Sequence, residues 1–582
     1  MAARPHLALI SLLLLLFVAA PAGPAAAQGP ERVGHGLREL SDAWQQGGEP
    51  ALRAAASRHR VRLRESPTGP LVPVILEPWP GRRGSDIDPA AIRALGARVD
   101  AVSESFVRVL APPGVLLRLG ELPDVQKARM PAVPTPLGSG FGSVVSESVS
   151  LTGAGTLQSS GVTGAGIKAA VVDVGFSGLT AAKNAGEIPA GTIGKDFTGT
   201  GLETTTSHGV AVAEELVDMA PGVQLYCVKI GDEVDLQNAT AYLRAQGVRI
   251  ANHSVAWVLS SYYDDTGTIN DIINASHDQD GVFWSVAVGN AARRHWRGPW
   301  VDADGDDALD FSSGSDDLGL TVGDGTISLF LNWNQYPAAA TDLDLYVLDA
   351  NGAVAASSLS PQTGTQPPTE SVSFSYDPAL APYRAQVVHY AGPLSGLDVT
   401  LFSFDNDFSV RVPAASLMDP ADAHGAFAVG AIGVSQYPYA SPALESYSSQ
   451  GPTTDGRLKP DITAPDGTST YTYGMLASYG TSFSAPVIAG AAALLLQQHP
   501  TLDPNGLASA VASEVVDVGA AGPDPLYGAG RFTFAHASSG CGLGFELVLL
   551  LPPLQWLRRR RGRRLAPSKS AGLALSGPHW PL

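Results

Sequence analysis

The sequence has few cysteines, an excess of negative over positive charge, and only short apolar runs at its two ends. Cys227 and Cys541 are the only cysteines among 582 residues. The first lies in a predicted buried strand and the second begins a terminal apolar run, so we expect no bridge between them and a fold that stands without disulfides. The formal net charge of −18 argues against a nucleic-acid partner.

The N-terminal apolar run predicts export. An early Arg4, an apolar stretch from Leu7 to Ala19 and the small residues Ala25 to Ala27 form the pattern of a secretory signal peptide over residues 1–27. The apolar stretch is too short for a comfortable membrane span. We therefore expect a secreted or cell-surface protein.

The length of the chain predicts more than one folded unit. Over residues 141–297 and 413–537, short apolar strands alternate with helical patterns. Such alternation indicates an α/β fold in which helices cover both faces of a parallel sheet.

A serine stands at the start of a small-residue helix, in the stretch from Tyr479 to Pro486. Gly480 allows a tight turn before Ser482, and we expect Pro486 to fall within the first helical turn, where its missing N–H costs little. A serine at a helix start has free backbone donors beside its oxygen, which would stabilise a negative tetrahedral intermediate. An ordinary serine N-cap is the alternative.

Two further motifs precede this serine. A buried strand from Ile167 to Val172 delivers Asp173 at its C-terminal end, and His208 heads another small-residue helix in Ser207-His208-Gly209-Val210-Ala211-Val212-Ala213. The order Asp173, His208, Ser482, with Gly-Thr-Ser-x-Ser-x-Pro at the serine and His-Gly-x-x-Val-Ala at the histidine, resembles the subtilisin-like serine peptidases. The likeness covers roughly residues 160–297 and 415–535.

This resemblance implies a serine endopeptidase that needs no cofactor for its chemistry and acts on protein or peptide substrates. Ser482 would be the nucleophile, His208 the base, Asp173 its orienting carboxylate, and Asn290 the side-chain donor to the oxyanion. Ser254, Val255 and Ala256 match the stretch that in the family pairs with substrate as a β-strand. The family usually has glycines after this serine, whereas Ala256 and Trp257 stand here, which leaves the shape of the primary pocket open.

Residues 28–140 precede the peptidase-like part. From about residue 70 to 130, strands alternate with two helices in a pattern that fits a small ferredoxin-like α+β unit. In position and pattern this unit resembles the inhibitory prodomain of subtilisin-like precursors, so we expect a self-processed zymogen whose propeptide is an intramolecular inhibitor. A structural domain that stays attached is the alternative. The Pro/Gly/Ser-rich residues 131–142 are the expected place of a cut.

Residues 298–412 interrupt the peptidase-like pattern with alternating strands and turn signals, which predicts an inserted all-β module of sandwich or jelly-roll type. Substrate or surface binding and simple stabilisation are both open for it. At its entry, Asp302, Asp304 and Asp306 alternate around Gly305, as in the first half of a calcium loop. A structural Ca²⁺ site and a solvated acidic turn are the two interpretations.

Residues 538–582 form a terminal tail. Small residues, a short apolar run from Phe545 to Leu557 and the basic cluster Arg558 to Arg561 follow one another and resemble a bacterial sorting signal with transient membrane contact. Direct anchoring is the alternative. We expect a monomer, and two other functions stay open: a catalytically inactive binding scaffold and a serine hydrolase of narrow substrate range.

Overall fold

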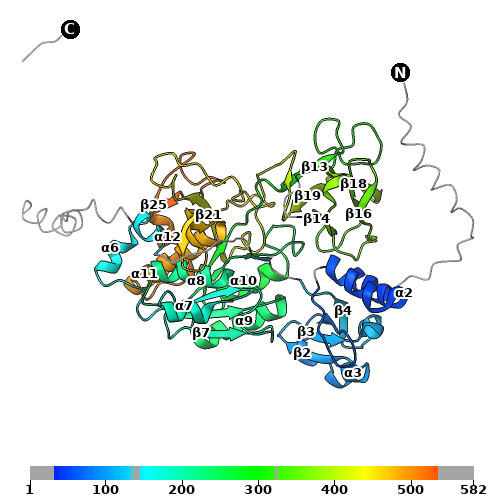
Figure 1. Cartoon of the computed structure of the whole chain (residues 1–582), viewed down its shortest axis with the longest axis horizontal. Helices are drawn as coiled ribbons and strands as arrows, with labels where there is room; N and C mark the ends of the chain where they lie inside the picture. Colours follow the sequence, from blue (N-terminus) through cyan, green and yellow to red (C-terminus); the bar gives the residue numbers. More distant parts are fainter. Residues whose placement is uncertain (1–31, 60, 133–134, 137–144, 322–324, 535–582) are drawn as a thin grey trace, which may run out of the picture.

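A computed structural model describes residues 32–59, 61–132, 135–136, 145–321 and 325–534 (Figure 1). The predicted signal peptide and the whole predicted tail, residues 538–582 with Cys541, lie outside this part of the chain. Within it, no helix combines the length and apolar character needed to cross a bilayer. Cys227 is buried and unbridged.

The largest element is a nine-stranded sheet in the order β25-β26-β22-β21-β11-β9-β6-β8-β7. All neighbouring strands are parallel except β25 and β26. The parallel sheet expected from the alternating pattern is therefore present. The strands are β6 Lys168–Asp173, β7 Ile193–Asp196, β8 Gln224–Lys229, β9 Ile250–His253, β11 Phe283–Ala287, β21 Ala426–Gly433, β22 Ile462–Asp466, β25 Val515–Val516 and β26 Arg531–Phe532.

Helices cover both faces of this sheet, and each face has its own apolar core. The first face carries α5 Ser148–Leu151, α6 Ala154–Ser159, α7 Leu179–Ala185, α8 His208–Met219, α11 Thr481–Gln498 and α12 Pro504–Ser513. The second carries α9 Glu233–Gln246 and α10 Thr268–Asp278. A small hairpin, β23 Thr468–Thr470 and β24 Gly474–Ser478, precedes α11.

The N-terminal unit is a four-stranded antiparallel sheet in the order β2-β3-β1-β4. Its elements are α2 His35–Arg58, β1 Val72–Pro78, α3 Pro89–Ala94, β2 Arg98–Val102, β3 Val107–Ala111, α4 Leu116–Leu119 and β4 Val125–Arg129. Helix α2, which is kinked at Gly48 (φ +62°), was not anticipated, because the sequence here is polar and rich in arginine; Leu37, Leu40 and Leu52 nevertheless reach the core. The second of the two expected helices is short, a 3₁₀ turn over Pro113–Val115 followed by α4.

The interrupting region forms two antiparallel sheets that enclose one apolar core. It enters between the parallel neighbours β11 and β21, and its first strand begins at His295. One sheet has the order β12-β19-β14-β17 and the other β16-β15-β18-β13-β20. The strands are β12 His295–Pro299, β13 Leu318–Thr321, β14 Thr326–Trp333, β15 Asp342–Leu348, β16 Val354–Ser358, β17 Thr369–Ser375, β18 Tyr383–Ala391, β19 Asp398–Ser403 and β20 Asp407–Phe408.

The N-terminal unit docks on α9 (Figure 1). Ile75 and Phe106 of its sheet pack on Val234, the second residue of that helix. Beside them, the Arg108 guanidinium donates to the carboxylates of Asp232 at 2.6 Å and Asp235 at 2.9 Å. The docking surface is thus a small apolar contact flanked by buried ion pairs.

Candidate active site

Asp173 and His208 meet where β6 ends and α8 begins. His208 Nδ1 lies 2.8 Å from Asp173 Oδ2, and both side chains are fully buried. The other carboxylate oxygen, Oδ1, accepts from the backbone N–H of Val174 at 2.8 Å. The carboxylate is therefore fixed from two sides, and it can hold the imidazole in the tautomer that carries its proton on Nδ1.

Gly209 makes this approach possible. A Cβ added at Gly209 would lie 2.7 Å from the carbonyl oxygen of Gly175 and 2.9 Å from Asp173 Cβ. Any larger residue would push the first turn of α8 away from the end of β6. The close contact between α8 and the end of β6 thus explains why a glycine, Gly209, follows His208.

Ser482 is the second residue of α11, whose N-cap is Gly480 with φ +126°. The helix begins at Thr481, so Pro486 is its sixth residue and lies in the second turn; the expectation that it falls within the first turn was wrong. Because Pro486 has no N–H, the carbonyl of Ser482, four residues earlier, loses its helical partner. Ser254 Oγ supplies a replacement at 2.9 Å.

Ser254 and Ser482 are joined in both directions. Ser482 Oγ donates to the carbonyl oxygen of Ser254 at 3.0 Å, and Asn252 Nδ2 donates to Ser254 Oγ at 2.9 Å. His208 Nε2 is buried and has no hydrogen-bond partner in the described part of the chain. Its ring contacts Phe483, the residue after Ser482, edge to face at 5.9 Å between ring centroids. The imidazole therefore stands beside the start of α11 with its Nε2 uncommitted.

Asn290 follows β11 and faces the start of the same helix. Its Oδ1 accepts from the backbone N–H and from the hydroxyl of Thr481, each at 3.0 Å. Since the oxygen end of the amide is held in this way, the NH₂ end points away from Thr481. The Asn290 amide is thereby fixed beside the start of α11.

The strand β10, Val255–Ala256, continues from Ser254 and pairs antiparallel with β5, Thr135–Pro136. The chain's own linker thus lies on the strand that was expected to bind substrate. Trp257 is 1% exposed, and its indole N–H donates to His253 Nε2 at 3.1 Å. Its bulk fills the core under α10 and leaves the shape of the pocket to other residues.

Sequence analysis missed a buried histidine and several buried carboxyls around these residues. His253 Nδ1 bonds to the carbonyl of Val172, directly before Asp173, and burial lowers the pKa of His253 to about 4. Asp466 accepts from the N–H of Gly480 at 2.9 Å, and burial raises its pKa to about 8. The one feature of the sequence that could have pointed to His253 and Asp466 is their position at the C-terminal ends of β9 and β22.

Glu214 and Asp218 on α8 are also held in an environment that disfavours charge. Burial raises the pKa of each to about 7. Glu214 accepts from the backbone N–H and hydroxyl of Thr472 at 2.9 and 2.7 Å. A helix that reads as small and apolar therefore carries carboxyls that fasten it to the loop after β23.

The three aspartates of the acidic loop do come together. One carboxylate oxygen from each of Asp302, Asp304 and Asp306 lies within 4.8 Å of the others. The Asp302 carboxylate accepts from the backbone N–H groups of Gly305 and Asp307 at 2.7 and 3.1 Å. Repulsion by Asp306 is the largest cause that raises the pKa of Asp304. The geometry suits a hard cation, and the turn also satisfies Asp302 without one.

Comparison with known proteins gives one family. Residues 384–530 match the Subtilase family. This stretch contains Ser482, whereas Asp173 and His208 lie outside it.

A curated relative is the Neisserial autotransporter lipoprotein NalP from two strains of Neisseria meningitidis serogroup B. It is 41% identical over 61 residues, which are 10% of this chain and 6% of the relative. The match thus spans a small part of that protein's length.

Among solved structures, the Clostridium perfringens CspB protease is similar with a TM-score of 0.50 at 16% identity. The match covers 68% of this chain and 98% of that chain. At this identity the likeness speaks for the fold.

Proposed function

We propose, from the premise that this chain is a subtilisin-like peptidase, that it is an exported serine endopeptidase which processes its own precursor. One observation carries the proposal. The chain's own linker pairs as a β-strand with Val255–Ala256, next to Ser254, whose carbonyl accepts the hydroxyl of Ser482. A polypeptide therefore lies in an extended conformation beside a serine at a helix start.

The proposed chemistry uses four side chains. Ser482 Oγ attacks the carbonyl carbon of the scissile peptide bond and gives its proton to His208 Nε2. Asp173 keeps the other imidazole proton on Nδ1 and stabilises the imidazolium without taking the proton itself. The amide of Asn290 and the backbone N–H of Ser482 donate to the oxyanion.

Collapse of this tetrahedral intermediate breaks the C–N bond. The leaving amine takes the proton from His208, and the acyl group stays on Ser482 as an ester. A water molecule then attacks the ester with His208 again as base, which releases the acid and restores the serine. The Ser482–Ser254 hydrogen bond would have to break first, so it describes a resting arrangement.

The N-terminal unit is the proposed intramolecular inhibitor. It holds its linker against β10 through the ion pairs on α9 and through the backbone N–H of Ala132, which donates to Glu233 Oε2 at 2.9 Å. Export is proposed on the pattern of residues 1–27. A structural Ca²⁺ at Asp302, Asp304 and Asp306 is proposed on their convergence.

The test uses the exported protein and its Ser482→Ala variant. Wild type should react with a fluorophosphonate probe, cut casein and lose its N-terminal unit, whereas the variant should do none of these, because alanine has no attacking oxygen. Both proteins are expressed in a host that lacks other exported proteases. Equal processing of the two, with no labelling of wild type, would mean an inactive binding scaffold. Labelling with turnover of simple esters alone would mean a narrower hydrolase.

A further inference from the structure

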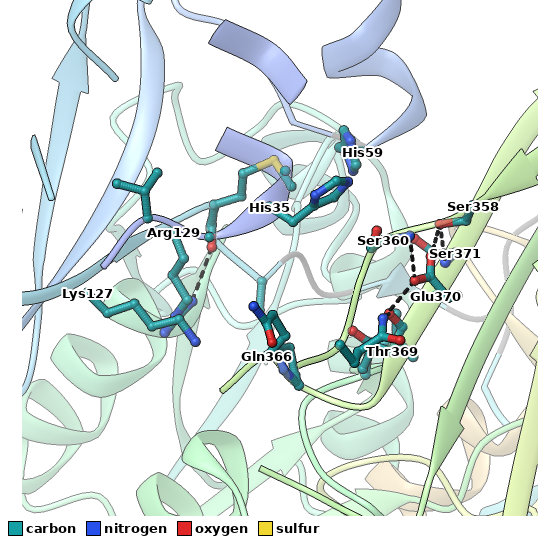
Figure 2. Close-up of a pocket in the computed structure, with 18 of the residues that line it drawn as sticks. His35, His59, Lys127, Arg129, Ser358, Ser360, Gln366, Thr369, Glu370 and Ser371 are labelled. Atoms are coloured by element: carbon teal, nitrogen blue, oxygen red, sulfur yellow. Dashed lines mark hydrogen bonds between the residues drawn. The ribbon is translucent and has the colours of Figure 1, made fainter. Parts of the chain in front are cut away.

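A cavity of about 310 Å³ lies where the N-terminal unit, the peptidase sheet and the inserted β-module meet (Figure 2). In Figure 2, His35, Lys127 and Arg129 of the N-terminal unit stand opposite Ser360 and Glu370 of the module, among the residues labelled on each side. The residues that follow β10 also line the cavity. Three parts that are far apart in the sequence thus share one space.

The start of the linker lines this cavity, ahead of its pairing beside the candidate active site. Met130, Pro131 and Ala132 line the cavity, and Thr135–Pro136 then pairs with Val255–Ala256. Pro136 lies opposite Val255, directly beside Ser254 and hence beside Ser482. A substrate that pairs with β10 in the same direction as the linker would place at this cavity the residues several positions N-terminal to its scissile bond. Ala132 precedes Pro136 by four residues.

On the peptidase side of the cavity, the lining residues are Val258 and Leu259, which follow β10. Leu259 has φ +60°, a conformation that costs energy for a branched side chain and persists only where its surroundings hold it. Two contacts hold this segment. The backbone N–H of Trp257 donates to the backbone carbonyl of Asp419 at 3.0 Å. Leu259 packs on the cluster of Ala256, Phe330 and Phe402. Because Phe330 and Phe402 belong to the module, the module itself holds Leu259 in place.

The module's side of the cavity is the connection from β16 to β17 with the strand ends that flank it, residues 358–371, called the loop 358–371 below; hydrogen bonds within this segment hold it in place. The Glu370 carboxylate is 2% exposed and accepts from Ser360 N–H at 2.9 Å, Gln362 Nε2 at 2.8 Å and the hydroxyl of Ser358. Gln366 accepts from Thr363 N–H at 2.7 Å. A segment whose hydrogen bonds are already made internally loses little conformational entropy when it binds a substrate.

We propose that the inserted β-module is a substrate-recognition element, whose loop 358–371 binds, together with Val258 and Leu259, the segment of a polypeptide substrate several residues before the cleaved bond. In the structure Met130–Ala132 line the same cavity as that loop, N-terminal to the residues that pair with β10. The inference rests on the proposed peptidase function and assigns its substrate class: extended polypeptides, with short peptides cut poorly.

The lining also selects the chemistry of that segment. On the peptidase and module sides, the described lining residues include two prolines, serines, threonines and glutamines, and no lysine or arginine. The Glu370 carboxylate already accepts hydrogen bonds from within the loop 358–371. The linker residues that line the same cavity, Met130, Pro131 and Ala132, are uncharged. An apolar or uncharged segment is therefore preferred over an acidic or basic one.

The test compares two quenched fluorogenic peptides that copy this chain, one with residues 135–140 and one with residues 130–140. The enzyme is the protein purified after export, with its N-terminus determined. We expect kcat/KM to be about tenfold higher for the longer peptide, the effect of burying about one apolar side chain. A third peptide with lysines at positions 130 and 132 should lose this gain.

Two matched variants assign the gain to the loop. Ser360 lines the cavity, whereas its neighbour Leu359 is 50% exposed and does not. Ser360→Trp should fill the space and bring the longer peptide down to the rate of the shorter one, with the shorter one unchanged. Leu359→Trp and Ser360→Ala should keep the difference between the two peptides.

Each outcome decides a different claim. Equal kcat/KM for the two lengths, or a Ser360→Trp variant that slows both peptides alike, overturns the role of the module and leaves the peptidase standing. Failure to cut either peptide or to react with a fluorophosphonate overturns the proposed function and the inference with it.

Discussion

Arg108 should control how tightly the N-terminal unit binds the peptidase unit. Its side chain is 6% exposed and donates to Asp100 at 2.8 Å, as well as to Asp232 and Asp235 across the docking surface. In Arg108→Met, these carboxylates stay buried or half-buried without their cation. The change therefore removes the attraction while the cost of burying the acids remains.

The magnitude follows from the burial of the partners. Removing one member of a buried pair costs about 3–5 kcal/mol. Burial, with the charge of Asp232 next to it, raises the pKa of Asp235 and so opposes part of the attraction between this carboxylate and Arg108. We therefore take the lower end, about 3 kcal/mol, which corresponds to an increase of about 150-fold in the dissociation constant.

The assay is inhibition of the processed enzyme by the separate N-terminal unit, residues 32–136, which has its own apolar core. Arg108→Met in that unit should raise the inhibition constant about 150-fold. Arg98→Met, an exposed position of the same sheet, should leave it unchanged. Against an Asp232→Asn/Asp235→Asn enzyme, the Arg108→Met unit should recover much of the loss, since no charge is then left unpaired. Equal constants for Arg108→Met and Arg98→Met would refute the reasoning.

Three further predictions concern pH, backbone approach and calcium. The pKa of Glu214 is raised from 4.5 to about 7 by burial, so its stabilising contribution is full below pH 4.5 and is lost as pH rises through 7; Glu214→Gln should flatten the fall of Tm over that window. Gly209→Ala should separate His208 from Asp173 and lower kcat at least 100-fold in a folded protein, measured by peptide turnover and circular dichroism. Calcium should raise Tm in wild type, by about 2.7 kcal/mol of stability at a hundredfold excess over Kd, and much less in Asp302→Asn/Asp304→Asn.

Each of these has a contrary result. Parallel Tm curves for wild type and Glu214→Gln would mean that this carboxyl is charged in the folded state. Normal kcat in Gly209→Ala would mean that α8 can move away without loss. An equal calcium response in the double variant would leave the acidic loop as a solvated turn.

Local sequence was sufficient where one short segment carries the whole signal. The alternation of apolar strands with helices predicted the parallel sheet, because strands buried on both faces must be apolar throughout. The motifs around Asp173, His208 and Ser482 predicted residues that the fold then brings to neighbouring strand and helix ends. Asp302, Asp304 and Asp306 converge because they share one turn.

The sequence was not sufficient where a residue's role depends on a partner far along the chain. Pro486 was placed one turn too early, and the hydroxyl that replaces its missing N–H comes from Ser254, more than 200 residues away. Trp257 left the shape of the primary pocket open in the sequence, and in the structure it is a core residue. Helix α2 has a polar sequence and is held by contacts with a sheet that follows it.

The sequence by itself determined the fold class, because hydrophobic periodicity acts over a few residues, and it identified the candidate catalytic residues through the resemblance of their short motifs to a known family. Only the tertiary structure decided what stands around them. It put the linker on Val255–Ala256, Arg108 against Asp232, and the loop 358–371 at the same cavity as Val258 and Leu259. These contacts join three units whose packing depends on the shape and charge of whole surfaces, and no local pattern encodes such a surface.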